Sequence, residues 1–245
     1  MELYVIFVEN NSKNAAFHFS AEEYFTRYVK SEKPVIMLWQ TEKTVMLGSN
    51  QLVSLEVNKE YADKNEIIIV RRSSGGGAIY TDAGTVLYTV IEPVTKDIKN
   101  HREDVAENIV TILNKIGAPA ERKGRNDILI DSKKISGFAQ YTSGNHVCTH
   151  GSLLFDADLD ILNDVLIANP DKLQPKGISS IRSRVANIKS YLNNDLSVGE
   201  FINIIKENLL GNSNYENYHF TNDDLFKINQ IQDETYANES WNYRM

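Results

Sequence analysis

Short apolar runs, separated by polar or glycine-containing stretches, dominate the pattern along this chain. Runs of strand length, rich in aliphatic and β-branched residues, occupy 3–8, 35–39, 44–48, 67–70, 78–80, 86–91, 127–130, 134–137 and 151–155. Runs of this kind between turn-forming residues predict β-strands. The brief polar connections at 40–43 and 131–133 predict two hairpins, which join 35–39 to 44–48 and 127–130 to 134–137.

Helices are predicted between these strands. The candidate segments are 14–30, 57–65, 103–116, 159–167 and 198–210, and the third of them ends at Gly117. The stretch 211–218, rich in asparagine and tyrosine, predicts a loop. Because most strands are joined by short connections, we expect an α+β fold with mixed, largely antiparallel sheets and flanking helices, not a doubly wound parallel sheet. We expect a single catalytic domain over residues 1–245.

The composition limits the class of protein and the cellular compartment that we expect. The chain has 245 residues, 42% of them hydrophobic and 24% charged, which is ordinary for a soluble globular protein. A net charge of −7 argues against a general nucleic-acid binder. The single cysteine, Cys148, excludes an internal disulfide and favours a reducing compartment. The N-terminus does not resemble a signal peptide, and no apolar run approaches the roughly 20 residues of a membrane span. We therefore expect a cytoplasmic protein without a membrane partner.

The run Arg71-Arg72-Ser73-Ser74-Gly75-Gly76-Gly77-Ala78 is the first candidate for chemistry. We call residues 71–78 the glycine loop. It lacks the lysine and the spacing of a P-loop, and it does not open a helix as a dinucleotide-binding turn does. One interpretation is a tight glycine-rich connection between two strands. The other is a wall of a small-molecule pocket, where bare main chain packs along a ligand.

The second candidate is the segment Lys123-Gly124-Arg125-Asn126-Asp127, together with Lys134. In an antiparallel hairpin Asp127 and Lys134 can face one cavity from neighbouring strands. An ammonium there can hold a carboxylate and a phosphate together, and the carboxylate can orient the lysine or bind Mg²⁺ with Asn126. The competing interpretation is a surface salt bridge of little energetic value.

Two further segments leave alternatives open. Residues 176–187 combine arginines, serines and a lysine, which suits either a loop that grips phosphate or a solvated loop that leads into a helix capped by Ser179 or Ser180. Cys148 and His150, two residues apart on one strand, allow a thiol nucleophile, but a small buried side chain is the simpler interpretation. The histidines show no metal-ligand spacing.

Taken in order, these segments resemble the lipoate–protein ligase A family, which shares a superfamily with biotin ligases and octanoyltransferases. The motifs that carry the resemblance are R-R-S-S-G-G-G-A, G-R-N-D-I, K-I-S-G-x-A, H-G-S-L-L and K-G-I-S-S-I-R-S-R-V, and they extend over nearly the whole chain. The resemblance implies a biotin/lipoate ligase-like catalytic domain. It also implies ATP-dependent formation of lipoyl-AMP from lipoate, followed by transfer of the lipoyl group to a lysine of a lipoyl-carrier domain.

The resemblance assigns roles to particular residues. The catalytic positions would be Lys134 and Asp127, and Mg²⁺ would lie at Asn126 and Asp127. The contacts with substrate and adenylate would be Arg72, Ser74, Gly75, Gly76, Gly77, Tyr80, Thr81, Thr85, Asn126, Ala139, His150, Gly151, Gly177, Ser180, Arg182 and Arg184. The carrier would be a 2-oxoacid dehydrogenase E2 or a glycine-cleavage H protein.

The chain departs from the family pattern in four places. Thr81 stands where a histidine is common, Thr85 where an asparagine follows the glycine, and Thr149 where the first histidine of His-His-Gly is common. These changes bear on acyl preference or efficiency. The family also continues after a W-N-like segment into a small C-terminal accessory domain, whereas this sequence stops at Met245. We expect that domain to be absent, supplied by a second polypeptide, or removed.

Two other functions compete with the ligase. An octanoyl or lipoyl transferase would move the acyl group between carriers without ATP, but the related transferases place a cysteine near 124–127, where this chain has none. A non-catalytic module that binds lipoyl groups or carriers is the third possibility, and the retained Lys134 argues against it.

Replacing the only cysteine tests the thiol mechanism. We expect Cys148→Ser to keep ligase activity within a few-fold of wild type, because adenylate chemistry needs no nucleophilic side chain. Lipoyl transfer to an apo carrier, followed over time, measures this. Complete loss of transfer in a folded variant would contradict the prediction.

Overall fold

Two β-sheets form the framework of the structure. The computed structural model describes residues 4–167, 184–211 and 213–244. The larger sheet has eight strands in the order β11-β1-β2-β6-β10-β9-β8-β7, and the smaller has three in the order β4-β3-β5. Their bounds are β1 Tyr4–Val8, β2 Val35–Trp39, β3 Thr44–Leu47, β4 Ile68–Arg71, β5 Ile79–Thr81, β6 Thr85–Pro93, β7 Glu121–Lys123, β8 Asp127–Ile130, β9 Lys133–Ser143, β10 His146–Leu154 and β11 Asn214–Tyr218.

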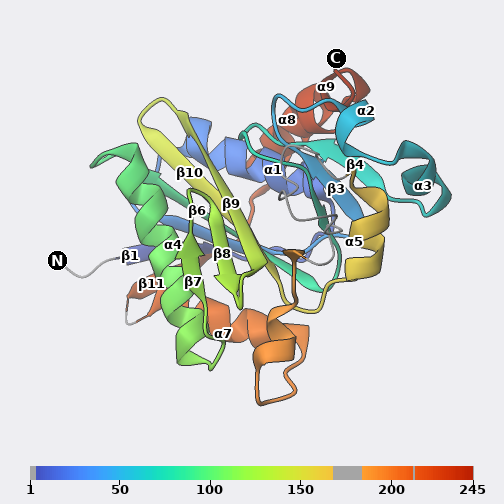
Figure 1. Cartoon of the computed structure of the whole chain (residues 1–245). Helices are drawn as coiled ribbons and strands as arrows, with labels where there is room; N and C mark the ends of the chain where they lie inside the picture. Colours follow the sequence, from blue (N-terminus) through green and yellow to red (C-terminus); the bar gives the residue numbers. More distant parts are fainter. Residues whose placement is uncertain (1–3, 168–183, 212, 245) are drawn as a thin grey trace.

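Helices cover both faces of the larger sheet (Figure 1). Helices α4 and α7 pack on one face, α1 and α8 pack on the other face near β1 and β2, and α2, α3 and α5 accompany the smaller sheet. The bounds are α1 Ala15–Tyr24, α2 Val53–Glu56, α3 Lys59–Lys64, α4 Ile98–Lys115, α5 Leu159–Val165, α7 Val198–Leu210, α8 Asn222–Ile231 and α9 Glu239–Asn242, with shorter turns η1 Phe25–Val29, η3 Ile188–Tyr191 and η4 Gln232–Tyr236.

Side-chain caps define where several helices begin. The Asn14 side chain accepts hydrogen bonds from the backbone of α1. Ser197 and Thr221 each form a capping box with an acidic residue three positions later, at the starts of α7 and α8. A capping box satisfies two backbone donors that the helix leaves free, so these local sequences fix the helix starts.

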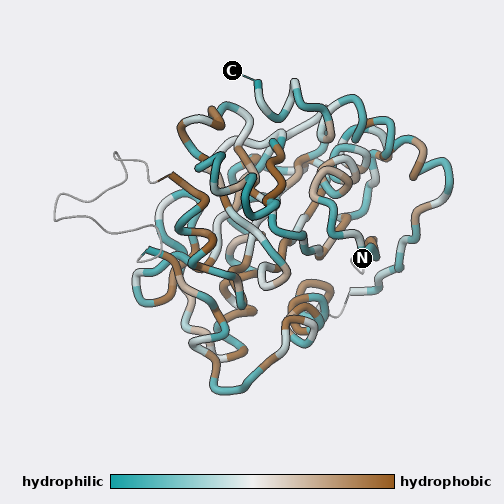
Figure 2. The backbone as a smooth tube through the Cα atoms, turned by 90° about the vertical axis from the view of Figure 1, so that its right-hand side faces the viewer, coloured by the Kyte–Doolittle hydropathy of each residue, from teal (hydrophilic) through white to brown (hydrophobic). Residues whose placement is uncertain are grey.

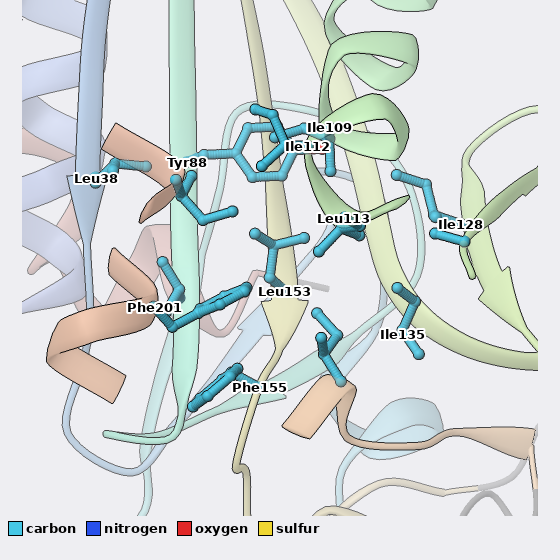
Figure 3. Packing of buried hydrophobic residues seen from close by; sticks show 14 of the residues in the cluster. Leu38, Tyr88, Ile109, Ile112, Leu113, Ile128, Ile135, Leu153, Phe155 and Phe201 are labelled. Atoms are coloured by element: carbon cyan, nitrogen blue, oxygen red, sulfur yellow. The ribbon is translucent and has the colours of Figure 1, made fainter. Parts of the chain in front are cut away.

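A continuous apolar core lies between the larger sheet and helices α4 and α7 (Figure 3). Tyr88 and Leu153 point from β6 and β10 toward Ile109 and Leu113 of α4. Phe155 stacks on Phe201 of α7 with ring centroids 4.2 Å apart, and Figure 2 shows the hydrophobic segments gathered in the interior. Burial of this apolar surface is what holds the helices on the sheet.

The expected fold class is confirmed, with most strand pairs antiparallel. One predicted hairpin is confirmed, since β8 and β9 pair around the predicted turn. The other hairpin is wrong: β2 belongs to the larger sheet and β3 to the smaller one. Both strands are buried along their whole length, because each is an inner strand of its own sheet, and the pattern alone cannot assign their partners.

The predicted loop over 211–218 is also partly wrong. Residues Asn214–Tyr218 form β11, which pairs parallel with β1 at the edge of the larger sheet. An edge strand has one free side and tolerates polar side chains, so its composition resembled that of a loop. Within the described residues, no helix combines the length and the apolar character needed to cross a bilayer.

Gly84 offers a test of backbone packing. A Cβ at this position would lie 1.9 Å from the carbonyl oxygen of Asp156, so the Gly84→Ala substitution forces two backbone segments apart. We expect it to lower the free energy of unfolding by about 1–3 kcal/mol in urea denaturation.

Gly199, in the first turn of α7, serves as the matched control. Its Cβ would meet no atom within 4 Å, and Gly199→Ala should raise stability by about 0.4–1 kcal/mol. Equal stability of the two alanine variants would contradict this account of Gly84.

Candidate active site

A cavity of about 620 Å³ lies between the two sheets. This volume is in the range of pockets that enclose a small-molecule ligand. The larger sheet and its turns contribute residues from β2, β6, β8, β9 and β10, and the opposite wall comes from β3, β5, the glycine loop and α5. The glycine loop is therefore a wall of a pocket, as the second interpretation of the sequence proposed.

The Arg72 guanidinium shapes that wall from within. It donates hydrogen bonds to the carbonyl oxygens of Gly75 and Gly77 at 2.9 and 2.8 Å, and to that of Met46 at 3.0 Å. Gly76, between the two bonded carbonyls, has a φ of +101°, a conformation that favours glycine. Burial lowers the pKa of Arg72 to about 10, which leaves the group charged at neutral pH. One buried cation thus holds the path of residues 75–77, which have no side chains of their own.

The hairpin β8–β9 supplies the charged end of the cavity. Lys134 Nζ lies 2.7 Å from Asp127 Oδ1, and both side chains are partly exposed at the cavity. The Lys134 ammonium also lies against Gly137, where a Cβ would come within 2.8 Å of it. The predicted juxtaposition of the two residues is confirmed, and the bare backbone of Gly137 makes room for the ammonium.

Asn126 adds an oxygen beside this ion pair. Its Oδ1 atom is buried and has no hydrogen-bond partner within the described residues. A buried amide oxygen normally has a partner, so this atom invites a ligand. Carboxylate and amide oxygens are what Mg²⁺ prefers, and Asp127 lies next in sequence. Asn126 and Asp127 therefore fit a hard divalent cation.

Aromatic and aliphatic side chains line the other end of the cavity. Phe19 from α1, Trp39 from β2 and Leu87 from β6 lie there, with Met46 on the opposite wall. Three strand spacings separate β2 from the Lys134 strand β9, which amounts to roughly 14 Å across the sheet. The cavity therefore has one charged end and one apolar end, which suits an extended amphipathic acid.

A buried hydrogen-bond network lies behind the apolar end. His150, which lines the cavity, places Nδ1 2.8 Å from Glu22 Oε2 and Nε2 2.6 Å from Ser74 Oγ. Thr89 donates to the other Glu22 oxygen at 2.6 Å, and Arg72 Nε donates to Ser74 at 3.1 Å. The sequence analysis missed Glu22, and the available signal was an acidic residue among the apolar positions of the predicted first helix.

Cys148 is fully buried beside this network. The Cys148 Sγ atom, a carboxylate oxygen of Glu22 and a ring nitrogen of His150 all lie within 4.8 Å of one another. Burial raises the pKa of the Cys148 thiol well above its ordinary value. Both ring nitrogens of His150 are hydrogen bonded within the protein, to Glu22 and Ser74. The thiol is the small buried side chain that the simpler interpretation expected.

Most of the predicted site residues that the structure describes line this cavity. They are Arg72, Gly76, Gly77, Tyr80, Asn126, Asp127, Lys134, Ala139, His150, Gly151 and Arg184. Ser74 and Gly75 do not line it but hold His150 and Arg72. Gly177, Ser180 and Arg182 fall outside the described residues.

The two threonine positions lie apart from the cavity lining. Thr81 is buried in β5, where its hydroxyl lies 2.7 Å from that of Thr41. Thr85 is buried at the start of β6, close to the Asp82 carboxylate. Both side chains are bonded within the protein, so a direct contact of either one with a ligand stays a prediction.

Comparison with known proteins agrees with this geometry. Residues 14–210 match the family described as the lipoyl protein ligase A/B catalytic domain. Lipoate-protein ligase LplJ of Bacillus subtilis is 34% identical over 243 residues, which cover 98% of this chain and 73% of that protein.

Solved structures show the same fold. A bi-partite lipoate protein ligase from Thermoplasma acidophilum, described with its E2 lipoyl domain, has a TM-score of 0.86 and 26% identity, and the match covers 98% of this chain and 96% of that chain. A lipoate-protein ligase A bound with ATP has a TM-score of 0.83 and 25% identity, with 99% of each chain covered. The chain therefore belongs to the lipoyl protein ligase A/B catalytic domain family.

Proposed function

We propose that this protein activates lipoate with ATP and transfers the lipoyl group to a lysine of a lipoyl-carrier domain. The observation that carries the proposal is a cavity with the Lys134–Asp127 pair at one end and aromatic side chains at the other. Lipoate has the same polarity, with a carboxylate at one end of an apolar chain. The names of the relatives and the ATP bound to one of the solved structures support the same reaction.

Lys134 acts on the reacting atoms. In the first step a lipoate carboxylate oxygen attacks the α-phosphorus of ATP, the bond to the β-phosphate oxygen breaks, and pyrophosphate leaves. Negative charge accumulates between the carboxylate and the α-phosphate, where an ammonium stabilises it. Asp127 holds Lys134 Nζ at 2.7 Å and so fixes the ammonium before the substrates arrive.

The second step needs access from the surface. The amine of the carrier lysine attacks the acyl carbonyl of lipoyl-AMP, and AMP leaves with the bonding electrons and takes up a proton. The partly exposed Lys134 and Asp127 lie where the cavity meets solvent, so a lysine from another protein can reach this end. Neither step uses a nucleophilic side chain of the ligase itself.

The apolar end holds the chain and ring of lipoate by burial. Phe19, Trp39 and Leu87 provide apolar surface of the kind that stabilises such a group by roughly 25 cal/mol per Å² buried. Arg184 is the described end of the predicted adenylate-binding loop and also lines the cavity. We assign Gly177, Ser180 and Arg182 to the same loop on the sequence resemblance alone.

Asn126 and Asp127 would hold Mg²⁺. When bound there, the ion would neutralise phosphate charge as pyrophosphate leaves. The unpartnered Asn126 oxygen supports this assignment.

The carrier is a 2-oxoacid dehydrogenase E2 or a glycine-cleavage H protein. The E2 lipoyl domain described with the Thermoplasma ligase supports a partner of this kind. We further propose a cytoplasmic setting, a single catalytic domain over 1–245, and an accessory polypeptide where the reaction needs one. A transferase with a cysteine nucleophile is less well supported, because burial keeps the Cys148 thiol protonated.

Removing the ammonium tests the adenylation step. We expect Lys134→Ala to lower lipoate-dependent ATP–pyrophosphate exchange by about 10²- to 10³-fold, the usual effect of losing one group that stabilises transition-state charge. The neighbouring, exposed Lys133→Ala is the control and should stay near wild type. Equal exchange in the two variants, or lipoyl transfer that needs no ATP, would refute the role of Lys134.

The metal assignment predicts a change in the Mg²⁺ requirement. Asp127→Asn removes a charged oxygen ligand, so half-maximal exchange should need about tenfold more Mg²⁺. Asp131→Asn, in the exposed turn between β8 and β9, should leave the Mg²⁺ titration unchanged. A wild-type titration curve for Asp127→Asn would exclude this carboxylate as a ligand.

A further inference from the structure

The glycine loop is held from outside the cavity by the C-terminal segment 236–242, which the proposed reaction does not use. Figure 1 shows α9 near α2 at this end of the molecule, and α9 contacts β4, the strand that leads into the loop. The contacts concentrate on Arg71 and Ser73, whereas the residues that serve the cavity are Arg72 and Ser74. This alternation is the one expected for extended backbone, whose successive side chains point in opposite directions.

Both main-chain groups of Arg71 are capped by the side chains of the C-terminal helix. Arg71 N donates to Asn242 Oδ1 at 2.8 Å, and Trp241 Nε1 donates to the Arg71 carbonyl oxygen at 2.9 Å. Strand β4 lies at the edge of its sheet, and no further strand pairs with this side among the residues that the structure describes. Trp241 and Asn242 therefore do at Arg71 what a neighbouring strand would do, at the point where the strand becomes the loop.

The fully buried guanidinium of Arg71 also binds the C-terminal helix. It donates to the carbonyl oxygens of Trp241 and Asn242, each at 2.9 Å. It also donates to the carbonyl oxygens of Gly48 and Gln51 at 3.0 and 2.6 Å. Gly48 in turn lies so close to the glycine loop that its Cβ would be 2.1 Å from the Gly76 carbonyl oxygen. The guanidinium thus connects the C-terminal helix to the segment on which the loop rests.

Tyr236 fixes the next outward-facing residue. Its hydroxyl donates to Glu23 Oε2 at 2.9 Å and lies 2.6 Å from Ser73 Oγ, which leaves Ser73 as the donor of the second bond. The Tyr236 ring is buried, and Asn242 Nδ2 donates to its carbonyl oxygen at 2.9 Å. Arg71 and Ser73 are therefore held on either side of Arg72, the residue that shapes the pocket wall.

From these contacts we infer that Tyr236, Trp241 and Asn242 are positioning residues for the acyl pocket. None of the three lines the cavity or reaches the reacting atoms, although the Tyr236 ring packs against Phe19 of the lining, with ring centroids 5.7 Å apart. They set the path of residues 71–74, so that Arg72 can bind the loop carbonyls and Ser74 can bind His150. This inference rests on the proposed function, because it predicts the affinity for lipoate.

A pair of substitutions at Asn242 separates positioning from mere stability. Asn242→Leu keeps the branched shape in a larger side chain and removes both the acceptor for Arg71 N and the donor to Tyr236. The KM for lipoate in ATP–pyrophosphate exchange should therefore rise at least about five- to tenfold, the usual effect of one lost buried hydrogen bond. The KM for ATP should stay within about twofold of wild type. Asn242→Asp keeps the acceptor for Arg71 N but loses the donor to the Tyr236 carbonyl oxygen, so its lipoate KM should lie between those of wild type and Asn242→Leu.

Two further variants keep the test decisive if Asn242→Leu does not fold. Tyr236→Phe removes one hydroxyl and should also raise the lipoate KM. Thr221→Ala removes the cap of α8, a part of the same C-terminal region that does not contact the loop, and should lower the melting temperature without changing either KM.

The outcomes distinguish the two proposals. A rise in the lipoate KM of Asn242→Leu and Tyr236→Phe, with a smaller rise in Asn242→Asp, supports positioning. Variants that lose only kcat or melting temperature, with an unchanged lipoate KM, overturn it while the proposed function stands. A folded wild type that shows no lipoate-dependent exchange overturns both.

Discussion

Two adjacent arginines at the end of β4 organise the site, and their guanidinium groups are buried in opposite directions. Arg72 binds the carbonyls of the glycine loop, and Arg71 binds those of the C-terminal helix and of residues near Gly48. A buried charge without partners is costly, so each guanidinium requires carbonyl oxygens at fixed places. The loop that forms one wall of the cavity is held by these requirements, since its three glycines contribute no side-chain contacts.

The opposite wall follows from strand order. Neighbouring strands β8 and β9 carry the ion pair, and β2 and β6 carry the apolar residues at some distance across the same sheet. The cavity therefore changes from charged to apolar in the direction perpendicular to the strands. A ligand that lies across the strands meets charge first and aromatic rings last, which matches the polarity of lipoate.

Local patterns predicted the parts of this site that lie close together in the sequence. The Lys134–Asp127 pair followed from a predicted hairpin in which the two residues are seven positions apart, and the pocket wall followed from three consecutive glycines. The predicted pairing of β2 with β3 was wrong because two buried strands of similar composition do not indicate which sheet each one joins. Glu22 and His150 are 128 positions apart, and Arg71 and Asn242 are 171 positions apart. Contacts of this kind depend on the completed fold, and one sequence holds no local signal for them.

The network around His150 has a further consequence for what the ligand meets. Thr89 has a single hydroxyl proton and gives it to Glu22, and it accepts the indole proton of Trp39. Ser74 accepts from Arg72 and lies 2.6 Å from His150 Nε2, and His150 Nδ1 lies 2.8 Å from Glu22 Oε2. Both imidazole nitrogens are therefore engaged by protein partners, and neither is left for a ligand. A buried polar network can thus border an apolar binding site, because His150 offers the bound chain no hydrogen-bonding nitrogen.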